Sequence, residues 1–180
     1  YEAIEILMFD VCKEFVLEDH CVIVEIRSSL KDNKETGLTK ELYLKAMIAG
    51  KIRFLEYFRA NFEAENFQKL GFVKETPPLI GILPSINRRN MSDAEEIIKL
   101  AAKYSNHCQG IDLSGDPSFG DIDQIVDLLK NVAKKKYKLK LAVHLGEFET
   151  DRPVRDTLRR VSRRFSLRSF ISFLCFIGFN

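Results

Sequence analysis

The chain has 180 residues, of which 46% are hydrophobic and 30% are charged, and its formal net charge is +2. These values are typical of one globular domain and exclude a collagen-like repeat, a disordered chain and a small disulfide-rich scaffold. The sequence also contains no run of about 18 apolar residues of the kind that crosses a membrane as a helix.

The charge is unevenly distributed along the chain. Residues 151–180 contain seven Arg and two Asp, whereas residues 1–150 contain 21 basic and 24 acidic side chains. An acidic body is typical of an enzyme or a small-molecule-binding domain and argues against a nucleic-acid polymer as partner. The four cysteines have no paired spacing, and the N-terminal stretch is unlike a signal peptide. Both features predict a cytoplasmic location.

The first third of the chain predicts a helix, a strand and a second, longer helix. Apolar side chains recur at helical spacing before residue 16, and the run 21–26 is β-branched, as in a buried strand. After a polar loop over residues 28–37, a helix is predicted from Thr39 to about Gln68. The apolar positions of the two predicted helices are Ile4, Leu7, Val11, Phe15, Leu42, Ala46, Ala49, Phe54 and Phe58.

Three more strands and two more helices are predicted before residue 145. The first of these helices has Ile97, Ile98, Ala101 and Ala102 on one face. Its start, at residues 92–95, matches a capping box, in which Ser and Glu side chains satisfy free backbone N–H groups. The second helix is predicted over residues 121–135. The three strands are predicted over residues 79–83, 110–113 and 139–143. This alternation predicts an α/β fold with a parallel sheet, either a barrel or an open sheet.

The segment 151–180 does not continue this alternation. It contains seven Arg followed by a mainly apolar and aromatic run over residues 170–179. We expect residues 1–150 to form the domain and residues 151–180 to be a tail outside the fold. Contact of this basic and aromatic tail with an acidic membrane surface is the alternative.

Polar side chains follow the predicted strands, at the sheet edge where α/β proteins bind their ligands. His144 ends the last strand and could bind a divalent metal, and Glu147 could act as a general acid or base. The same two residues could equally be a satisfied histidine beside a solvated glutamate. Gly115 would let a ligand approach the backbone, although residues 112–117 could also form an ordinary turn. Asp112 is costly to bury unless it is paired.

Two segments together resemble the adenosine/AMP deaminase superfamily: Gly110-Ile-Asp-Leu-Ser-Gly-Asp-Pro117 and Leu139-Lys-Leu-Ala-Val-His-Leu-Gly-Glu147. Within it, the sequence is most similar to the adenosine deaminase-like proteins that act on N6-methyl-AMP. Residues 24–29 and 36–40 match the same subgroup. The resemblance covers about residues 1–147 and implies a partial TIM (β/α)₈ barrel of about four βα units, the family's strands two to five. We therefore expect the chain to be a fragment of a longer protein.

The resemblance also implies an activity and a set of site residues. Full-length members use zinc to deaminate 6-amino or N6-methyl purine nucleoside monophosphates by hydrolysis, a reaction of purine salvage. By this resemblance, His144 would be a zinc ligand and Glu147 the proton donor. Gly115 would contact the purine through its backbone, and Asn87 would contact the ribose. The phosphate-binding stretch would be Ser28, Ser29, Leu30 and Lys31.

The sequence departs from the family pattern in several places. The His-x-His, Gly-His-Gly and Asp-Asp motifs are absent, so only one of the family's four protein zinc ligands is present. Leu30 and Lys31 replace the usual Pro and Arg, and Asn87 replaces Asp. We therefore expect a monomer that is inactive on its own. The alternatives are an adenosine deaminase that acts on the nucleoside, and a non-catalytic purine-binding or interaction fragment whose tail contacts a membrane surface.

Overall fold

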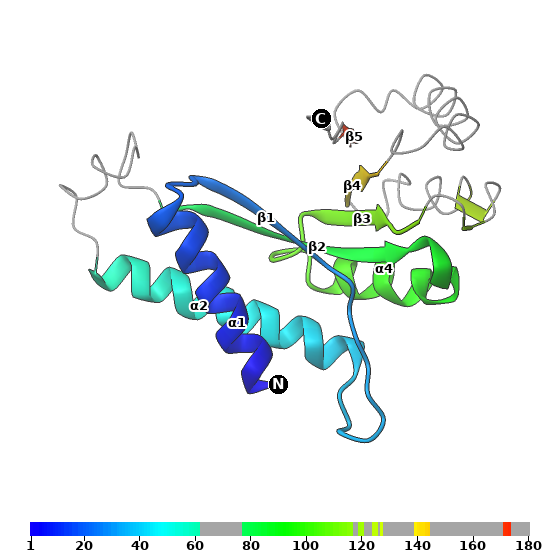
Figure 1. Ribbon diagram of the computed structural model, residues 1–180, viewed down its shortest axis with the longest axis horizontal. Helices are drawn as coiled ribbons and strands as arrows, with labels where there is room; N and C mark the ends of the chain where they lie inside the picture. The colour runs from blue at the N-terminus through cyan, green and yellow to red at the C-terminus, as the bar shows by residue number, and fades with distance from the viewer. Residues whose placement is uncertain are drawn as a thin grey trace. The chain divides into compact units, whose positions relative to one another are not determined.

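The structure of the chain is a computed structural model (Figure 1). It describes residues 1–61, 77–116, 119–120, 124–125, 127, 139–144 and 171–173. The chain divides into two compact units: residues 1–26 and 30–82 form the first, and residues 27–29 and 83–180 form the second.

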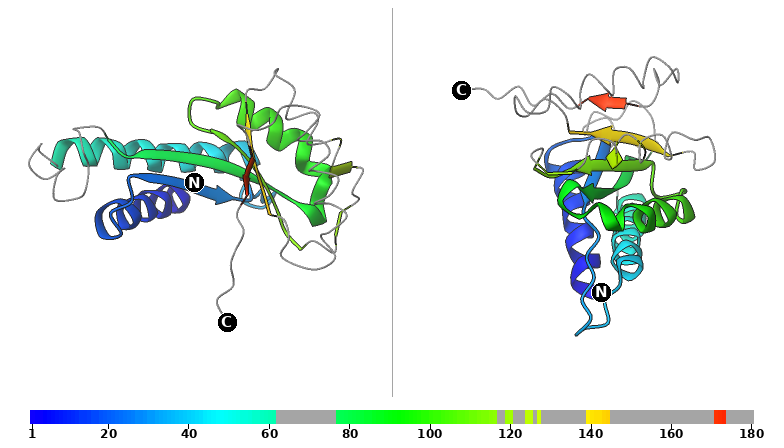
Figure 2. Two further views of the ribbon diagram at one scale, coloured as in Figure 1. Left: turned by 90° about the horizontal axis from the view of Figure 1, so that it is seen from above. Right: turned by 90° about the vertical axis from the view of Figure 1, so that its right-hand side faces the viewer.

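The first unit is built around two helices that lie side by side (Figures 1 and 2). The helix α1 (Glu2–Lys13) continues into one π-helical turn, η1 (Glu14–Glu18), and the helix α2 spans Lys40–Asn61. Thr39 caps α2, because its Oγ1 accepts a hydrogen bond from the Leu42 N–H at 3.1 Å. This confirms the predicted start of the helix, whereas its predicted end at residue 68 lies outside the described residues.

The face by which α1 packs differs from the expected one. Met8, Cys12 and Val16 are buried, whereas Leu7 is 62% exposed and Phe15 is 42% exposed. The physical reason is a close approach of the two helices at one residue of α2, Gly50. A Cβ atom there would lie 2.8 Å from the Cβ of Met8 and would also clash with the carbonyl oxygen of Glu5. The backbone of α2 therefore lies against the turn that contains Met8, and this contact turns Leu7 outward.

The first strand, β1 (Ile23–Ser28), begins two residues later than predicted and is half-buried, not fully buried. It lies beside the start of β2 (Leu79–Asn87), where the Leu79 N–H donates to the Val22 carbonyl at 3.0 Å. The residues between β1 and α2 make a tight loop in which Asn33 and Leu38 form an isolated bridge. The polar loop predicted before α2 is therefore present.

The second unit contains a parallel sheet. The remainder of β2 is followed by a 3₁₀ segment, η2 (Arg88–Asp93), the helix α4 (Ala94–Lys103) and the strands β3 (Gly110–Ser114), β4 (Lys140–Val143) and β5 (Ile171–Phe173). The strands lie in the order β2-β3-β4-β5, and each neighbouring pair is parallel. The α/β fold with a parallel sheet is thus confirmed.

Two details of the second unit correct the sequence-based predictions. The strand β2 runs four residues beyond its predicted end, to Asn87, so Ser85 belongs to the sheet. The capping box is wrong: the N-cap of α4 is Asp93, which makes no side-chain cap hydrogen bond. Ser92 Oγ donates instead to Asn90 Oδ1 at 2.6 Å, and Glu95 pairs with Lys99. The predicted buried face of this helix is confirmed for Ile97, Ile98 and Ala101.

Part of the expected tail lies in the sheet. Residues 171–173 form β5 and pair with residues 141–143 of β4. This differs from our expectation that the tail lies outside the fold, while the predicted boundary at residue 150 lies outside the described residues and stays a prediction. Among the described residues, no helix has both the length and the apolar composition that crossing a membrane requires.

Candidate active site at the ends of the strands

A buried carboxylate, Asp112, lies near the end of β3 with its side chain 1% exposed. The parallel register pairs Asp112 with Ser85 of β2, so the two side chains lie on the same face of the sheet. The Ser85 hydroxyl donates a hydrogen bond to Asp112 Oδ2 at 2.9 Å. This bond satisfies one of the two carboxylate oxygens inside the sheet.

The other oxygen, Asp112 Oδ1, faces two basic side chains from other strand ends. His144 Nε2, directly after β4, lies 3.3 Å from it, and Arg27 Nη1, near the end of β1, lies 3.7 Å from it. Neither approach has hydrogen-bond geometry, so Oδ1 has no hydrogen-bond partner in the structure. Because the carboxylate is buried, the positive charge of Arg27 offsets part of the cost of removing it from water. Asp112 of β3 thus lies next to three side chains: Arg27 of β1, Ser85 of β2 and His144 directly after β4.

The backbone of His144 is also fixed. Its N–H donates to the Leu113 carbonyl at 3.1 Å, which extends the hydrogen bonding between β3 and β4 by one residue. Its carbonyl oxygen accepts a hydrogen bond from Nη2 of Arg88, whose side chain is buried at 2% exposure. These two hydrogen bonds hold the backbone of His144 in place.

Gly115 and Asn87 lie against each other at the ends of β3 and β2. Gly115 has a φ of +95°, which strongly favours glycine, and a Cβ atom there would lie 2.6 Å from Asn87 Oδ1. The same oxygen accepts a hydrogen bond from the Arg89 N–H at 2.9 Å. The structure therefore brings these two predicted site residues together, and the glycine is needed for contact with the asparagine.

The predicted phosphate-binding stretch divides between the two units. Ser28 and Ser29 belong to the second unit, and Leu30 and Lys31 belong to the first. The Ser28 hydroxyl points to the Ser29 carbonyl oxygen at 3.5 Å, Leu30 is 5% exposed and Lys31 is exposed. A role of these four residues in binding phosphate stays a prediction. Glu147 lies outside the described residues.

The described residues do not by themselves form a zinc site. Among them, no group of three or more His, Cys, Asp or Glu side chains could hold a metal ion. Asp112 Oδ1 and His144 Nε2 are 3.3 Å apart. That separation suits two ligands of one zinc ion at about 2.0–2.1 Å, but a structural zinc site has four ligands and a catalytic site three protein ligands. The cationic side chain of Arg27 near the same oxygen further opposes a metal there.

Sequence reasoning missed three residues of this cluster: Arg27, Ser85 and Arg88. The spacing of Ser85 and Asn87 could have indicated that both lie on one sheet face, but only if β2 had been extended past Pro84. No sequence signal distinguishes the buried Arg88 from the exposed Arg89 beside it.

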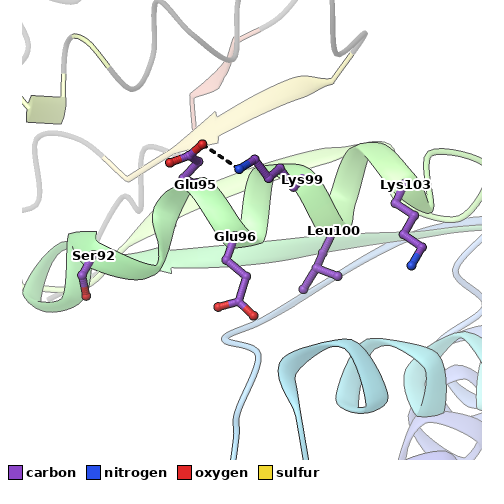
Figure 3. A pocket seen from close by; sticks show the side chains of 6 residues that line it. All are labelled: Ser92, Glu95, Glu96, Lys99, Leu100 and Lys103. Atoms are coloured by element: carbon purple, nitrogen blue, oxygen red, sulfur yellow. Dashed lines mark ion pairs between the residues drawn. The ribbon is translucent and has the colours of Figure 1, made fainter.

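A second feature of this unit is a pocket of about 400 Å³ along α4 (Figure 3). Two of its lining residues, Glu95 and Lys99, form an ion pair of 2.7 Å, and the hydrogen bond and positive charge of Lys99 lower the pKa of Glu95. The pocket is lined by Ser92, Glu95, Glu96, Lys99, Leu100 and Lys103. None of these residues belongs to the Asp112 cluster.

Comparisons with known proteins identify relatives of the chain, although no protein-family model matches it. It is 33% identical over 143 residues to an N6-methyl-AMP deaminase from Bos taurus, covering 77% of this chain and 35% of the relative. It is 30% identical over 152 residues to an N6-methyl-AMP deaminase from Mus musculus, covering 81% and 37%.

Solved structures show the same likeness in fold. The structure of an Arabidopsis N6-mAMP deaminase superposes with a TM-score of 0.69 at 26% identity, covering 88% of this chain and 43% of the other. The Arabidopsis protein ADAL complexed with GMP superposes with a TM-score of 0.71 at 25% identity, covering 98% and 47%. The chain thus spans less than half the length of these relatives, and the expected partial (β/α)₈ barrel is confirmed.

Proposed function

Because this chain is homologous to the N6-methyl-AMP deaminases over about four fifths of its length, we propose that the whole protein hydrolyses a 6-substituted purine nucleoside monophosphate, with N6-methyl-AMP as the preferred substrate. Water adds at C6 of the purine and methylamine leaves, so the products are IMP and methylamine. The observation that carries the proposal is the 33% identity over 143 residues to an N6-methyl-AMP deaminase.

Within this function, the chain supplies part of the substrate site. Ligands of parallel α/β proteins bind at the carboxyl ends of the strands, where His144, Asn87 and Gly115 lie. Structures of the Arabidopsis relative complexed with IMP and with GMP support a purine nucleotide as the ligand class. The described residues do not make a zinc site, so no step is assigned to a metal that they bind. We therefore propose that the 180-residue chain alone binds nucleotide without deaminating it.

A chimera tests this function directly. The segment of the Arabidopsis N6-mAMP deaminase that matches this chain would be replaced by the corresponding residues of the chain, and methylamine release from N6-methyl-AMP would be measured. We expect activity in the chimera, none in its His144→Ala variant and none in the isolated chain. A chimera that folds, as judged by circular dichroism, but neither binds IMP nor releases methylamine would contradict the proposal. Methylamine release by the isolated chain would overturn its predicted inactivity.

The preference for a nucleotide over a nucleoside is tested at Ser29. If this hydroxyl contacts the 5′-phosphate, Ser29→Ala removes a hydrogen bond to a charged group and weakens IMP binding about tenfold. Inosine binding should not change, because inosine lacks the phosphate. Calorimetric titration with both ligands measures the difference, and Ser92→Ala on the pocket along α4 is the control. Equal weakening for IMP and inosine would contradict a contact between Ser29 and the 5′-phosphate.

A further inference from the structure

The segments that follow β2 and β3 are tied together by one exposed side chain, Arg89. Its Nη2 lies 3.0 Å from Asp116 Oδ2, and its guanidinium lies 4.3 Å from the centre of the Phe119 ring. Arg89 follows β2, whereas Asp116 and Phe119 follow β3. The same guanidinium therefore makes both an ion pair and a cation–π contact with the loop after β3.

Residues that follow β3 lie close to the end of β2 at two glycines. The Phe119 N–H donates to the Asp116 carbonyl at 3.1 Å, so the two residues that contact Arg89 belong to one turn. Glycines with positive φ lie on either side of that turn, Gly115 at +95° and Gly120 at +91°. A Cβ atom at Gly120 would lie 3.3 Å from the carbonyl oxygen of Arg88. The loop thus approaches the end of β2 closely on both sides of the Arg89 contact.

These contacts order the loop more than they stabilise the whole unit. The Arg89 side chain is 59% exposed and that of Asp116 is 38% exposed, so solvent screens their attraction. Exposed ion pairs and exposed cation–π contacts are each weak. Local opening of a loop, however, requires far less free energy than unfolding of the unit. Two weak contacts on one loop can therefore control how often it opens while they leave global stability nearly unchanged.

We propose that Arg89 is a positioning residue that holds Asp116 and Phe119 beside the end of β2 and so holds the part of the sheet edge that a purine nucleotide meets. The first half of this proposal is that Arg89 holds Asp116 and Phe119 in place. The second half is that this helps a purine nucleoside monophosphate to bind, and it therefore rests on the proposed function. Arg89 acts through the loop and makes no contact with a reacting atom.

Hydrogen exchange tests the first half in the full 180-residue chain without a ligand. In Arg89→Gln, which keeps a polar side chain but loses the charge and the guanidinium, we expect the Phe119 amide to exchange about three- to tenfold faster. Arg89→Lys keeps the charge but loses the planar stack, so it should fall between Arg89→Gln and the unmodified chain. A matched control is available in the first unit: Arg53 is 57% exposed, lies 3.8 Å from Glu5 Oε1 and stacks over Phe9 at 5.0 Å. Arg53→Gln should leave the exchange of the Phe119 amide unchanged.

Calorimetric titration with IMP tests the second half. We expect Arg89→Gln to weaken IMP binding about three- to tenfold with no more than a small change in melting temperature, whereas Arg53→Gln should bind IMP like the unmodified chain. Unchanged loop exchange in Arg89→Gln would overturn the role of Arg89, as would an equal loss of IMP affinity in Arg53→Gln. Faster loop exchange without loss of IMP affinity would overturn the link to the ligand. If the unmodified chain does not bind IMP at all, the proposed nucleotide binding fails, while the exchange experiment still decides whether Arg89 fixes the loop.

Discussion

The buried carboxylate at the strand ends makes the most direct prediction about the site. Asp112→Asn keeps the shape of the side chain but removes its charge. One amide oxygen can still accept the Ser85 hydroxyl, as Oδ2 does at 2.9 Å. The amide nitrogen would then occupy the place of Oδ1 and would face Arg27, which is also a donor, and His144 Nε2. The substitution therefore replaces the attraction between Asp112 and Arg27 with an unfavourable contact, and it removes the carboxylate from beside His144.

The size of the effect follows from the burial of the three side chains. Breaking a fully buried ion pair by removing one partner costs about 3–5 kcal/mol. Here Asp112 is 1% exposed, but Arg27 is 20% exposed and His144 is 21% exposed, so water reaches the partners and reduces the penalty. We expect a loss of about 2–3 kcal/mol in the free energy of unfolding. Ser85→Ala removes only the hydroxyl donor to the carboxylate and should cost about 1.5 kcal/mol.

Urea denaturation followed by circular dichroism measures both losses. For an m-value of about 2 kcal/mol/M, the midpoint of Asp112→Asn should fall by about 1–1.5 M. Glu95→Gln changes a carboxylate to an amide in a solvent-exposed ion pair with Lys99 and should leave the midpoint unchanged. If Asp112→Asn behaves like Glu95→Gln, the electrostatic contacts of Oδ1 do not stabilise the fold, and the reasoning is refuted.

Two further predictions concern the packing of α1 on α2. Gly50→Ala should lower the melting temperature because the added Cβ would lie 2.8 Å from Met8 Cβ. This clash should outweigh the preference for alanine over glycine inside a helix, which is about 1 kcal/mol and which Ala49→Gly measures as the control. A higher melting temperature for Gly50→Ala would contradict the close contact of the two helices. Burial raises the pKa of the Cys12 thiol to about 12 against the opposing charge of Lys51, so the unfolded chain loses this proton at lower pH than the folded chain. Stability should therefore fall as pH rises from about 9 to about 12, and this fall should be smaller in Cys12→Ser, as urea denaturation at several pH values would show.

The order of helices and strands could be predicted because each element has a local pattern. The β-branched run before residue 27 and the apolar face of α4 are recognisable without tertiary information. The buried face of α1 could not be predicted in this way. Its sequence offers several apolar positions, and the choice among them depends on Gly50 of α2, which lies more than thirty residues away in the sequence. Local periodicity cannot contain that information.

The capping box failed for a related reason. Ser92 and Glu95 have the right spacing, but both have closer partners, Asn90 and Lys99. A side chain that can make two alternative hydrogen bonds takes the one that the surrounding backbone permits, and here the 3₁₀ segment before α4 brings Ser92 next to Asn90. A spacing rule predicts that a hydrogen bond is possible and does not decide between competitors.

The candidate site could be predicted for residues at strand ends, where the position follows from topology. His144, Asn87 and Gly115 lie where a parallel sheet exposes its carboxyl edge. The residues that hold them in place could not be predicted, because they lie inside the sheet and are found only from the register. Ser85 contacts Asp112 because the two strands pair at those residues, and a register shifted by one residue would place the two side chains on opposite faces.

The way in which His144 is held has a consequence for the function of the chain. Its amide, its carbonyl oxygen and its ring each face a different residue: Leu113, Arg88 and Asp112. All of these residues lie within the second unit, although the chain spans less than half the length of its relatives. These contacts of His144 therefore come from residues of this chain. Because groups that are already held in place lose less entropy when a ligand binds, we expect a longer chain to add missing groups around a His144 backbone that is already held.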